Sequence, residues 1–300
     1  MPDGSEENPD ISSDSRNDSY QPFINNNESR LKEDLKKSLR ECAGAFGGPA
    51  LETILCENFG KHIEEMRLIL QYVPEGGRIL DIGGGLGVNL QCIRKLRDSD
   101  LRLFLIDRFE EYTEENRMGP SDVGTQRMAE LGIEVNTQDL MISPTLPYDS
   151  GFFDVVTNFD VVEHLPRHPI ALLREIFRVL KRNGKLILGA PNSISLMKRV
   201  KLLCGVHPYM KFDLWISDRY YDHYREYSPD EYRKLLEISG FENIRTKLTT
   251  EPSRTRAVNH YWRGKHSPFS PTALALWLAF VTETIIPPLR PSVLCVGEKK

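Results

Sequence analysis

Short apolar runs alternate with stretches of helical periodicity from residue 76 onward. In the helical stretches, apolar residues recur three and four positions apart, and glycine or proline often follows the last of them. This alternation is typical of βαβ units, so we expect an α/β domain: a doubly wound, mostly parallel seven-stranded sheet with helices on both faces. The strands are predicted at residues 78–82, 102–107, 133–137, 153–158, 185–190, 241–249 and 292–296.

Two helices are marked most clearly. Apolar residues recur at helical spacing over 169–181, and Gly184 follows. The second helix opens at Ser228-Pro-Asp-Glu231, which is the pattern of a capping box with proline in the first turn, and closes at Gly240. Further helices are predicted from residue 31, over 61–72 and over 88–97.

The first thirty residues differ from the rest of the chain. They are rich in Ser, Asn, Asp and Glu, and they carry two basic against seven acidic residues. We therefore expect a disordered acidic tail at 1–30 and one folded domain at 31–300. The whole chain has a formal charge of −4. Because the negative charge lies in the first thirty residues, the folded part is close to neutral. Within it, we expect an aromatic-rich substrate lid at 192–227 and a helical insert at 250–290.

Composition excludes several classes of protein. The five cysteines form no CxxC pair and no Cys/His cluster at zinc spacing, so neither a disulfide scaffold nor a metal site is expected. The N-terminus lacks the pattern of a signal or transit peptide, which predicts a cytoplasmic protein. The longest apolar run, 273–281, is far shorter than the about 20 residues that span a bilayer.

A glycine-rich turn is the first sign of a ligand site. In RILDIGGGLG (78–87), Gly83, Gly85 and Gly87 stand between a predicted strand and a predicted helix, where a nucleoside-bearing ligand can lie against the backbone. Asp107 ends the next strand and can accept hydrogen bonds from ribose hydroxyls. A dinucleotide is the weaker alternative, because the G-x-G-x-x-G fingerprint needs glycine where Val88 stands.

Several motifs, in the same order, resemble class I S-adenosylmethionine-dependent methyltransferases, particularly the small-molecule, ubiquinone-biosynthesis-like type. The resemblance runs from about residue 76 to 240 and rests on DIGGGLG, acidic Asp107, QDL (138–140), FDVVTNFDVVEHL (153–165), REIFRVLKRNGKLILGAPN (174–192) and HYREYSPDEYRKLLEISGF (223–241). It implies a Rossmann-like methyltransferase fold, methyl transfer, and S-adenosyl-L-methionine as cofactor.

The resemblance also implies roles for individual residues. The motif of the glycine turn also contains Asp81 and Gly87. Within this turn, Gly83 and Gly85 would lie along the methionine part of the cofactor. Asp107 would hold the ribose, Asp139 and Leu140 would flank the adenine, and Asn158 and Phe159 would line the methionine side. Arg67 is a candidate partner of the cofactor carboxylate, with a solvent-facing helix charge as the alternative.

An alcohol acceptor needs a general base, because it attacks poorly while protonated. His164 and His223 are the candidate catalytic residues, and a structural role is the alternative for each. Glu163 is a candidate to orient the base or bind the cofactor amine.

The acceptor is the least determined feature. Asn-Phe-Asp-Val stands where amino-methylating enzymes carry Asn/Asp-Pro-Pro-Tyr/Phe, and the folded part is not basic overall, so no nucleic acid partner is expected. Basic segments at 197–211 and 245–266 and the apolar helix at 271–289 favour O-methylation of a glycan, glycolipid or lipid-linked intermediate, with peripheral membrane contact. The alternatives are a soluble metabolite or quinone-like ring, and a catalytically inactive binding protein.

Overall fold

The computed structural model describes residues 28–46, 58–97, 101–108, 122–209, 223–251, 253–255 and 271–300. Within these ranges it contains one seven-stranded sheet in the order β3-β2-β1-β4-β5-β7-β6. Strand β7 runs antiparallel to its neighbours β5 and β6, and the other pairs are parallel, which confirms the predicted fold class. The strands are β1 (Arg78–Ile82), β2 (Arg102–Asp107), β3 (Ile133–Thr137), β4 (Phe153–Phe159), β5 (Leu180–Pro191), β6 (Glu242–Thr249) and β7 (Ser292–Glu298).

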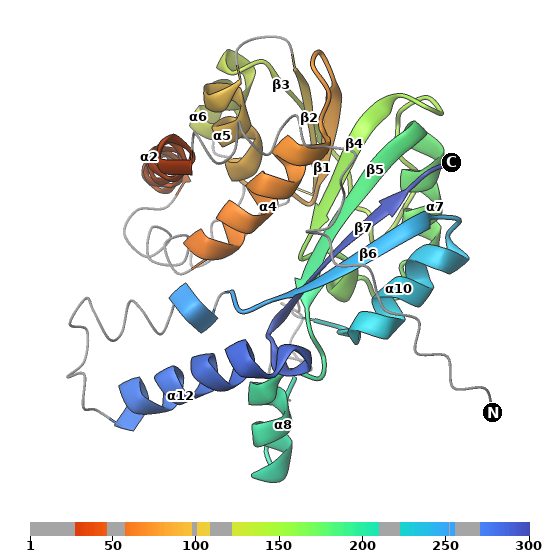
Figure 1. Ribbon diagram of the computed structural model, residues 1–300. Helices are drawn as coiled ribbons and strands as arrows, with labels where there is room; N and C mark the ends of the chain where they lie inside the picture. Colours follow the sequence, from red (N-terminus) through yellow and green to blue (C-terminus); the bar gives the residue numbers. More distant parts are fainter. Residues whose placement is uncertain are drawn as a thin grey trace.

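Helices cover both faces of the sheet (Figure 1). One face packs against α2 (Glu28–Phe46), α4 (Phe59–Tyr72), α5 (Val88–Leu96) and α6 (Asp122–Glu130). The other face packs against α7 (Ile170–Val179) and α10 (Pro229–Ile238). Because both faces are covered, the inner strands are buried except at their ends and consist largely of apolar runs, which is why the sequence pattern reveals them.

The boundary between α7 and β5 differs from the prediction. We expected the helix to reach residue 181 and the strand to begin at 185, but Leu180 already pairs with Phe153 of β4. The pairing then shifts register and resumes at Lys185, with Asn183 in a left-handed conformation (φ 64°) between the two parts. Leu180 thus belongs to the sheet, although the local periodicity assigns it to the helix.

The capping box of α10 is confirmed. The Glu231 amide donates to Ser228 Oγ (3.3 Å), and the Ser228 amide donates to Glu231 Oε2 (2.8 Å). At the N-terminus, α2 begins at Glu28, so residues 28–30 of the predicted tail are helical. Leu31, Leu35 and Leu39 pack on the core at four-residue spacing, and the preceding turn continues the same helix. The expected tail at 1–27 lies outside the described residues.

The two predicted inserts are described in part. Within the lid at 192–227 the structure has α8 (Leu196–Leu203), and within the insert at 250–290 it has α12 (Pro271–Ile285) and the 3-10 helix η4 (Pro287–Leu289). Residues 210–222 and 256–270 lie outside the described ranges. None of the helices in the described ranges is long and apolar enough to cross a membrane.

The strand order locates a crevice. From β1 the chain moves outward to β2 and β3, and then returns to β4 on the other side of β1. At this reversal the loops after β1 and β4 diverge, and open α/β sheets bind ligands outside the carboxyl ends of these strands. Ile82 and Asn158 are paired neighbours at the ends of β1 and β4.

Candidate functional site

The glycine turn after β1 needs glycine for its backbone conformation and, at Gly83, also for packing. Gly83, Gly85 and Gly87 have φ angles of 69°, 50° and 63°, in the left-handed region that favours glycine. A Cβ on Gly83 would lie 2.2 Å from Val161 Cγ2, so packing alone demands glycine there. Among the described residues, nothing lies within 4 Å of a Cβ on Gly85. The turn is therefore closed by packing at Gly83 and faces open space at Gly85.

Asp107 ties this turn to the end of β2. The Gly85 amide donates to Asp107 Oδ2 (2.7 Å), and the Arg108 amide donates to Oδ1 (2.6 Å). Each carboxylate oxygen keeps a further lone pair, so two adjacent hydroxyls can still be bound. The position fits the predicted ribose contact.

Asp139 and Leu140 follow β3 and lie next to Asp107. Asp139 Oδ1 accepts from the Met141 amide (2.8 Å), and its Oδ2 lies 3.5 Å from Arg108 Nε. Leu140 is buried in the apolar cluster on the α7 side of the sheet. The predicted adenine contact would form at this place in the crevice. Arg108 is an additional charged neighbour there, which the sequence analysis did not identify.

Asn158 carries the clearest sign of an absent partner. Its side chain is fully buried, and neither Nδ2 nor Oδ1 has a hydrogen-bond partner among the described residues. Buried amides in native proteins are nearly always bonded, so a polar ligand at the ends of β1 and β4 explains this one. Phe159 packs against β5, since a Cβ on Gly189 would lie 2.7 Å from its ring. Its predicted contact with the methionine side stays a prediction.

Asp81 lies beneath the glycine turn. Its carboxylate is fully buried and accepts a hydrogen bond from Thr157 Oγ1 (2.6 Å), and a Cβ on Gly84 would lie 2.4 Å from Oδ2. Burial raises the pKa of Asp81 to about 7. The residue therefore supports the turn from inside, and a direct contact with the cofactor stays a prediction.

The raised pKa of Asp81 predicts a pH-dependent stability. Between about pH 4 and pH 7 the folded protein retains a proton that the unfolded chain has released, so the free energy of unfolding falls as pH rises, by at most about 1.4 kcal/mol per pH unit. Asp81→Asn removes this contribution. From pH 5 to pH 8, urea unfolding of the ligand-free protein should show the wild type losing about 2 kcal/mol more than the variant. Asp149→Asn, at an exposed position, is the control and should follow the wild type; equal losses in Asp81→Asn and wild type would contradict the assignment.

Helix α4 reaches the crevice through its first two turns. Lys61 forms an ion pair with Asp160, which follows β4, and Glu65 accepts a hydrogen bond from Asn89 of α5 (3.0 Å). Burial alone would lower the pKa of Lys61, but the carboxylates of Asp160 and Glu65 outweigh it and raise the pKa. Arg67 lies further along the helix, 4.0 Å from Glu64, and its contact with the cofactor carboxylate stays a prediction. Lys61 and Glu65 were not predicted, because nothing in the local sequence marks them among the other charges of α4.

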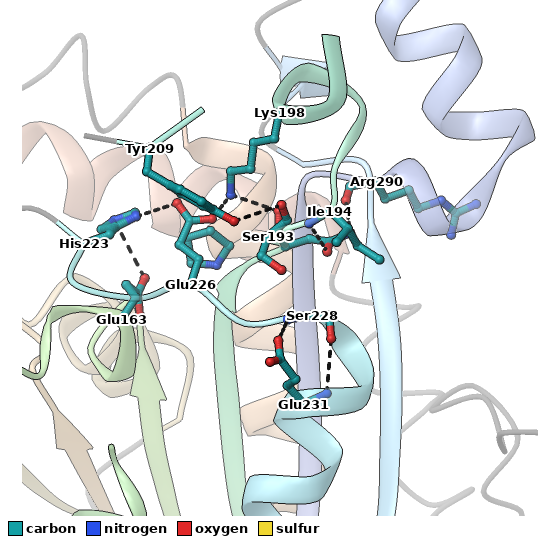
Figure 2. Close-up of polar contacts among 12 residues, drawn as sticks. Glu163, Ser193, Ile194, Lys198, Tyr209, His223, Glu226, Ser228, Glu231 and Arg290 are labelled. Atoms are coloured by element: carbon teal, nitrogen blue, oxygen red, sulfur yellow. Dashed lines mark hydrogen bonds and ion pairs between the residues drawn. The ribbon is translucent and has the colours of Figure 1, made fainter. Parts of the chain in front are cut away.

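The two candidate catalytic histidines lie together although 59 positions separate them (Figure 2 labels His223). His164 ends the 3-10 helix η3 (Val162–His164), and its ring centroid is 4.7 Å from that of His223. The amides of Tyr224 and Arg225 donate to the carbonyl oxygen of Glu163 (2.7 and 3.2 Å), which fixes the segment after the lid against η3. The two candidate residues are therefore brought together by tertiary contacts, which the sequence analysis did not predict.

Two glutamates lie beside His223, and one of them, Glu226, is hydrogen-bonded to it (Figure 2). Glu226 Oε1 accepts from His223 Nδ1 (2.8 Å), so Nδ1 carries the proton and Nε2 is the basic nitrogen of the neutral ring. Glu163 Oε1 lies 4.0 Å from Nε2. Burial, together with the nearby charge of Asp160, raises the pKa of Glu163 to about 8, so this carboxyl is mostly protonated at neutral pH. Neither Glu163 oxygen has a hydrogen-bond partner among the described residues.

Glu226 and Lys198 complete this group of side chains. Lys198 extends from α8, forms an ion pair with Glu226 and donates to the carbonyl oxygen of Asn192 (2.9 Å; Figure 2). Glu226 was not predicted, although the His-x-x-Glu spacing from residue 223 is a usable signal. Lys198 was noted only as part of a basic segment, because a sequence does not tell which lysine of a helix points inward.

A cation is an alternative occupant of the same place. Glu163, His164 and His223 each offer one ligand atom, and these atoms lie within 4.8 Å of one another. A carboxylate and two imidazoles suit several divalent metals. The sequence analysis expected no metal, and that expectation stays a prediction.

Only part of the predicted aromatic lid can be placed. Tyr209 donates to the carbonyl oxygen of Ser193 (3.4 Å) and is exposed, as is Tyr224. Tyr227 is buried, and its ring packs against Tyr232 of α10 (centroids 5.4 Å apart). The remaining aromatics, Phe212, Trp215, Tyr220 and Tyr221, lie outside the described residues.

The residues present fit a nucleoside-bearing cofactor. Gly85 faces open space beside Asp107, Asp139 follows the adjacent strand, and the orphaned amide of Asn158 lies at the strand-order reversal. Glu163 and His164 follow β4 at the same edge of the sheet, and the segment with His223 and Glu226 lies against them. A ligand that extends along this edge from β3 to β4 would have its far end next to the two histidines.

Comparisons with known proteins identify the family of the domain. A family model described as a methyltransferase domain matches residues 57–246. The ubiquinone biosynthesis O-methyltransferase of Xanthomonas axonopodis pv. citri is 29% identical over 128 residues, which are 41% of this chain and 48% of that protein. The enzyme of the same name from Nitrosococcus oceani is 25% identical over 152 residues, covering 46% of this chain and 57% of its own length. The match thus spans about half the length of these curated relatives.

A solved structure shares the fold. Phosphoethanolamine N-methyltransferase 2 of Haemonchus contortus, solved in complex with S-adenosyl-L-methionine, aligns with a TM-score of 0.51 at 15% identity. The alignment covers 93% of this chain and 60% of that one. At this identity the likeness concerns the fold, which has the same general architecture as the sheet and helices described above.

Proposed function

The chain belongs to the methyltransferase-domain family of class I S-adenosylmethionine-dependent proteins, and from this premise we propose that it methylates a hydroxyl oxygen of a small acceptor. One observation carries the choice of oxygen. His223 is held by Glu226 in the tautomer whose basic Nε2 faces the carboxyl end of β4, next to His164 and a mostly protonated Glu163. An alcohol must lose its proton as it attacks, and an oriented imidazole is suited to take it.

The cofactor supplies an electrophilic methyl group on a sulfonium sulfur, and this chain supplies its placement. In the proposed arrangement Asp107 accepts hydrogen bonds from the ribose hydroxyls, and Asp139 and Leu140 flank the adenine. The turn at Gly83 and Gly85 and the amide of Asn158 contact the amino-acid part. The methyl group would then point toward the His164–His223 pair.

In the proposed reaction the acceptor oxygen attacks in line with the carbon–sulfur bond. A carbon–oxygen bond forms, the carbon–sulfur bond breaks with its electron pair remaining on sulfur, and the hydroxyl proton moves to His223 Nε2. The products are the methyl ether, S-adenosylhomocysteine and one proton, which His223 releases to solvent. Glu226 stabilises the imidazolium while it exists, because its carboxylate bonds the opposite ring nitrogen (2.8 Å).

The proposed acceptor is a glycan, glycolipid or lipid-linked intermediate. Lys198 of α8 borders the histidine group, and Arg199 and Lys201 are exposed on the same helix; this favours an acceptor with anionic groups or one presented at an anionic surface. The alternative is a soluble metabolite or a quinone-like ring, which the name of the curated relatives favours. A catalytically inactive binding protein is the third possibility.

Turnover of candidate acceptors tests these proposals. S-adenosylhomocysteine is measured with sugar, lipid-linked and phenolic acceptors, each with and without EDTA. Formation with a hydroxyl acceptor in EDTA supports proton transfer to His223. Loss in EDTA that a divalent metal restores would favour a cation at Glu163, His164 and His223. Absence of turnover with every acceptor, together with absence of cofactor binding, would favour the inactive alternative.

Asp107→Ala should weaken cofactor binding about 100-fold. The substitution removes a charged acceptor of two ribose hydrogen bonds, each worth about 1.5 kcal/mol or more, and 2.7 kcal/mol corresponds to that factor. Isothermal titration calorimetry with S-adenosylmethionine measures the change. Asp154→Ala is the control, because Asp154 also accepts a backbone amide (Arg78, 2.9 Å) but lies at the start of β4. Equal affinities of the two variants would refute the ribose role.

A further inference from the structure

Exposed apolar side chains are concentrated on two helices. Of the fifteen large apolar side chains that are exposed in the described part of the chain, ten lie on α8, on α12 or within three residues after the C-terminal end of either helix. Leu203 is 87% exposed, and Trp277 is 44% exposed. Contiguous apolar surface of this kind marks an interaction site more often than scattered apolar residues do. We call this set the α8–α12 surface: Met197, Val200, Leu202, Leu203, Val206, Leu274, Trp277, Leu278, Ile285 and Ile286.

The two helices form one continuous feature. They contact each other, and Figure 1 shows both at the end of the molecule where β5 finishes, away from the helices that cover the sheet. Helix α8 has no buried residue, and among the described side chains of α12 Glu283 is the one that is buried. With 15 residues, α12 is about 22 Å long, too short to span the about 30 Å of a hydrocarbon core. Such helices suit the surface of a bilayer, not its interior.

The exposed charge on these helices is of one sign. Helix α8 carries Lys198, Arg199 and Lys201 and no acidic residue, and Arg199 and Lys201 are exposed. The acidic residue of α12, Glu283, is fully buried. Apolar side chains interspersed with exposed basic ones are the composition of interfacial helices that bind anionic lipids. Tryptophan is also the side chain that favours the boundary between lipid and water.

The surface and the histidine group share one helix. Lys198 turns from α8 into the site, where it pairs with Glu226, while Leu203 and Lys201 face solvent (Figure 2 shows Lys198). A bilayer in contact with the α8–α12 surface would therefore lie against the helix that supplies Lys198 to the proposed acceptor site. An acceptor anchored in that bilayer would reach His223 without leaving the lipid.

We propose that the α8–α12 surface docks on an anionic lipid bilayer and so presents the site to a membrane-anchored acceptor. The presentation of an acceptor rests on the proposed methyl transfer, whereas the docking on the bilayer does not. Charge favours the bilayer over a second copy of the chain, because a twofold contact through α8 would bring Arg199 and Lys201 near their own copies. Anionic headgroups would instead be attracted to these two side chains.

Vesicle cosedimentation of the full chain tests the docking. Vesicles of phosphatidylglycerol and phosphatidylcholine should bind the protein, and phosphatidylcholine alone, or added salt, should weaken the binding. Lys201→Glu should lower the partition about tenfold, since it removes one attraction and adds one repulsion. Leu203→Asp and Leu278→Asp should lower it by a similar factor. The controls are Lys234→Glu and Ile238→Asp on α10, which change an exposed lysine and an exposed isoleucine elsewhere and should bind as the wild type does.

Two results would overturn the docking. One is a wild-type protein that does not bind phosphatidylglycerol vesicles, or a partition that the α10 controls lower as much as the docking variants do. The other is a dimer in sedimentation velocity that Leu278→Asp dissociates, which would assign the surface to a second copy. Calorimetry with S-adenosylmethionine on the same variants separates this proposal from the proposed activity, because the docking variants should retain the wild-type cofactor affinity. Vesicle binding by a protein that does not bind the cofactor would refute the methyl transfer and leave the docking in place.

Discussion

Gly85→Val is expected to abolish measurable binding of S-adenosylmethionine, with an affinity at least about 100-fold below that of the wild type, or about 2.7 kcal/mol. A side chain at this position would enter the open space beside Asp107, because nothing in the described structure lies within 4 Å of a Cβ there. Isothermal titration calorimetry measures the loss. The fold should survive, since an added Cβ has no neighbour within 4 Å among the described residues and the left-handed φ of 50° costs about 1–2 kcal/mol.

Gly76→Val is the matched control for Gly85→Val. Gly76 also has a left-handed conformation (φ 64°), and a Cβ there also meets nothing within 4 Å. It precedes β1, however, whereas Gly85 follows it. The two variants should lose similar stability in urea unfolding, and Gly76→Val should bind the cofactor normally. Normal binding by Gly85→Val would place the cofactor elsewhere.

His223→Ala should lower kcat for a hydroxyl acceptor by about 100-fold to 10,000-fold and leave cofactor affinity unchanged. General bases contribute rate factors of this size, and in the proposed arrangement His223 contacts the acceptor, not the cofactor. Single-turnover formation of S-adenosylhomocysteine measures the chemical step separately from product release.

His164→Ala distinguishes the two neighbouring histidines. The ring of His164 lies 4.7 Å from that of His223, but the Glu226 hydrogen bond is made by His223. A much smaller loss is therefore expected for His164→Ala, and wild-type rates are expected for the exposed His168→Ala. A large loss in His164→Ala with little change in His223→Ala would transfer the proposed role to His164.

Much of the fold was predictable because its signals are local. Strands β1, β2 and β3 have the predicted bounds, since parallel strands covered on both faces must be short apolar runs. The start of α10 was predictable because its capping box consists of residues within one turn, Ser228 and Glu231. The end of α7 was predicted wrongly, because the pairing of Leu180 with Phe153 is a contact between strands that helical periodicity does not contain.

The site was predictable in part for the same reason. The glycine turn and Asp107 follow strands directly, so their places at the carboxyl edge follow from the sheet. Lys61 was missed as a partner of Asp160, and Glu226 as a partner of His223, because each pair depends on which face of its segment turns inward. Asn158 was predicted by position, but that its amide has no partner among the described residues is a property of the packed structure.

The sequence by itself determined the fold class, the glycine turn and the acidic residues at the strand ends. These features depend on the hydrophobic period and on the order of neighbouring residues, and both can be seen in the sequence directly. Only the tertiary structure decided which nitrogen of His223 bonds Glu226, how strongly burial raises the pKa of Glu163, and that α8 and α12 together expose one apolar and basic surface. These properties depend on distances between segments far apart in sequence and on the exclusion of water between them, and a linear pattern specifies neither.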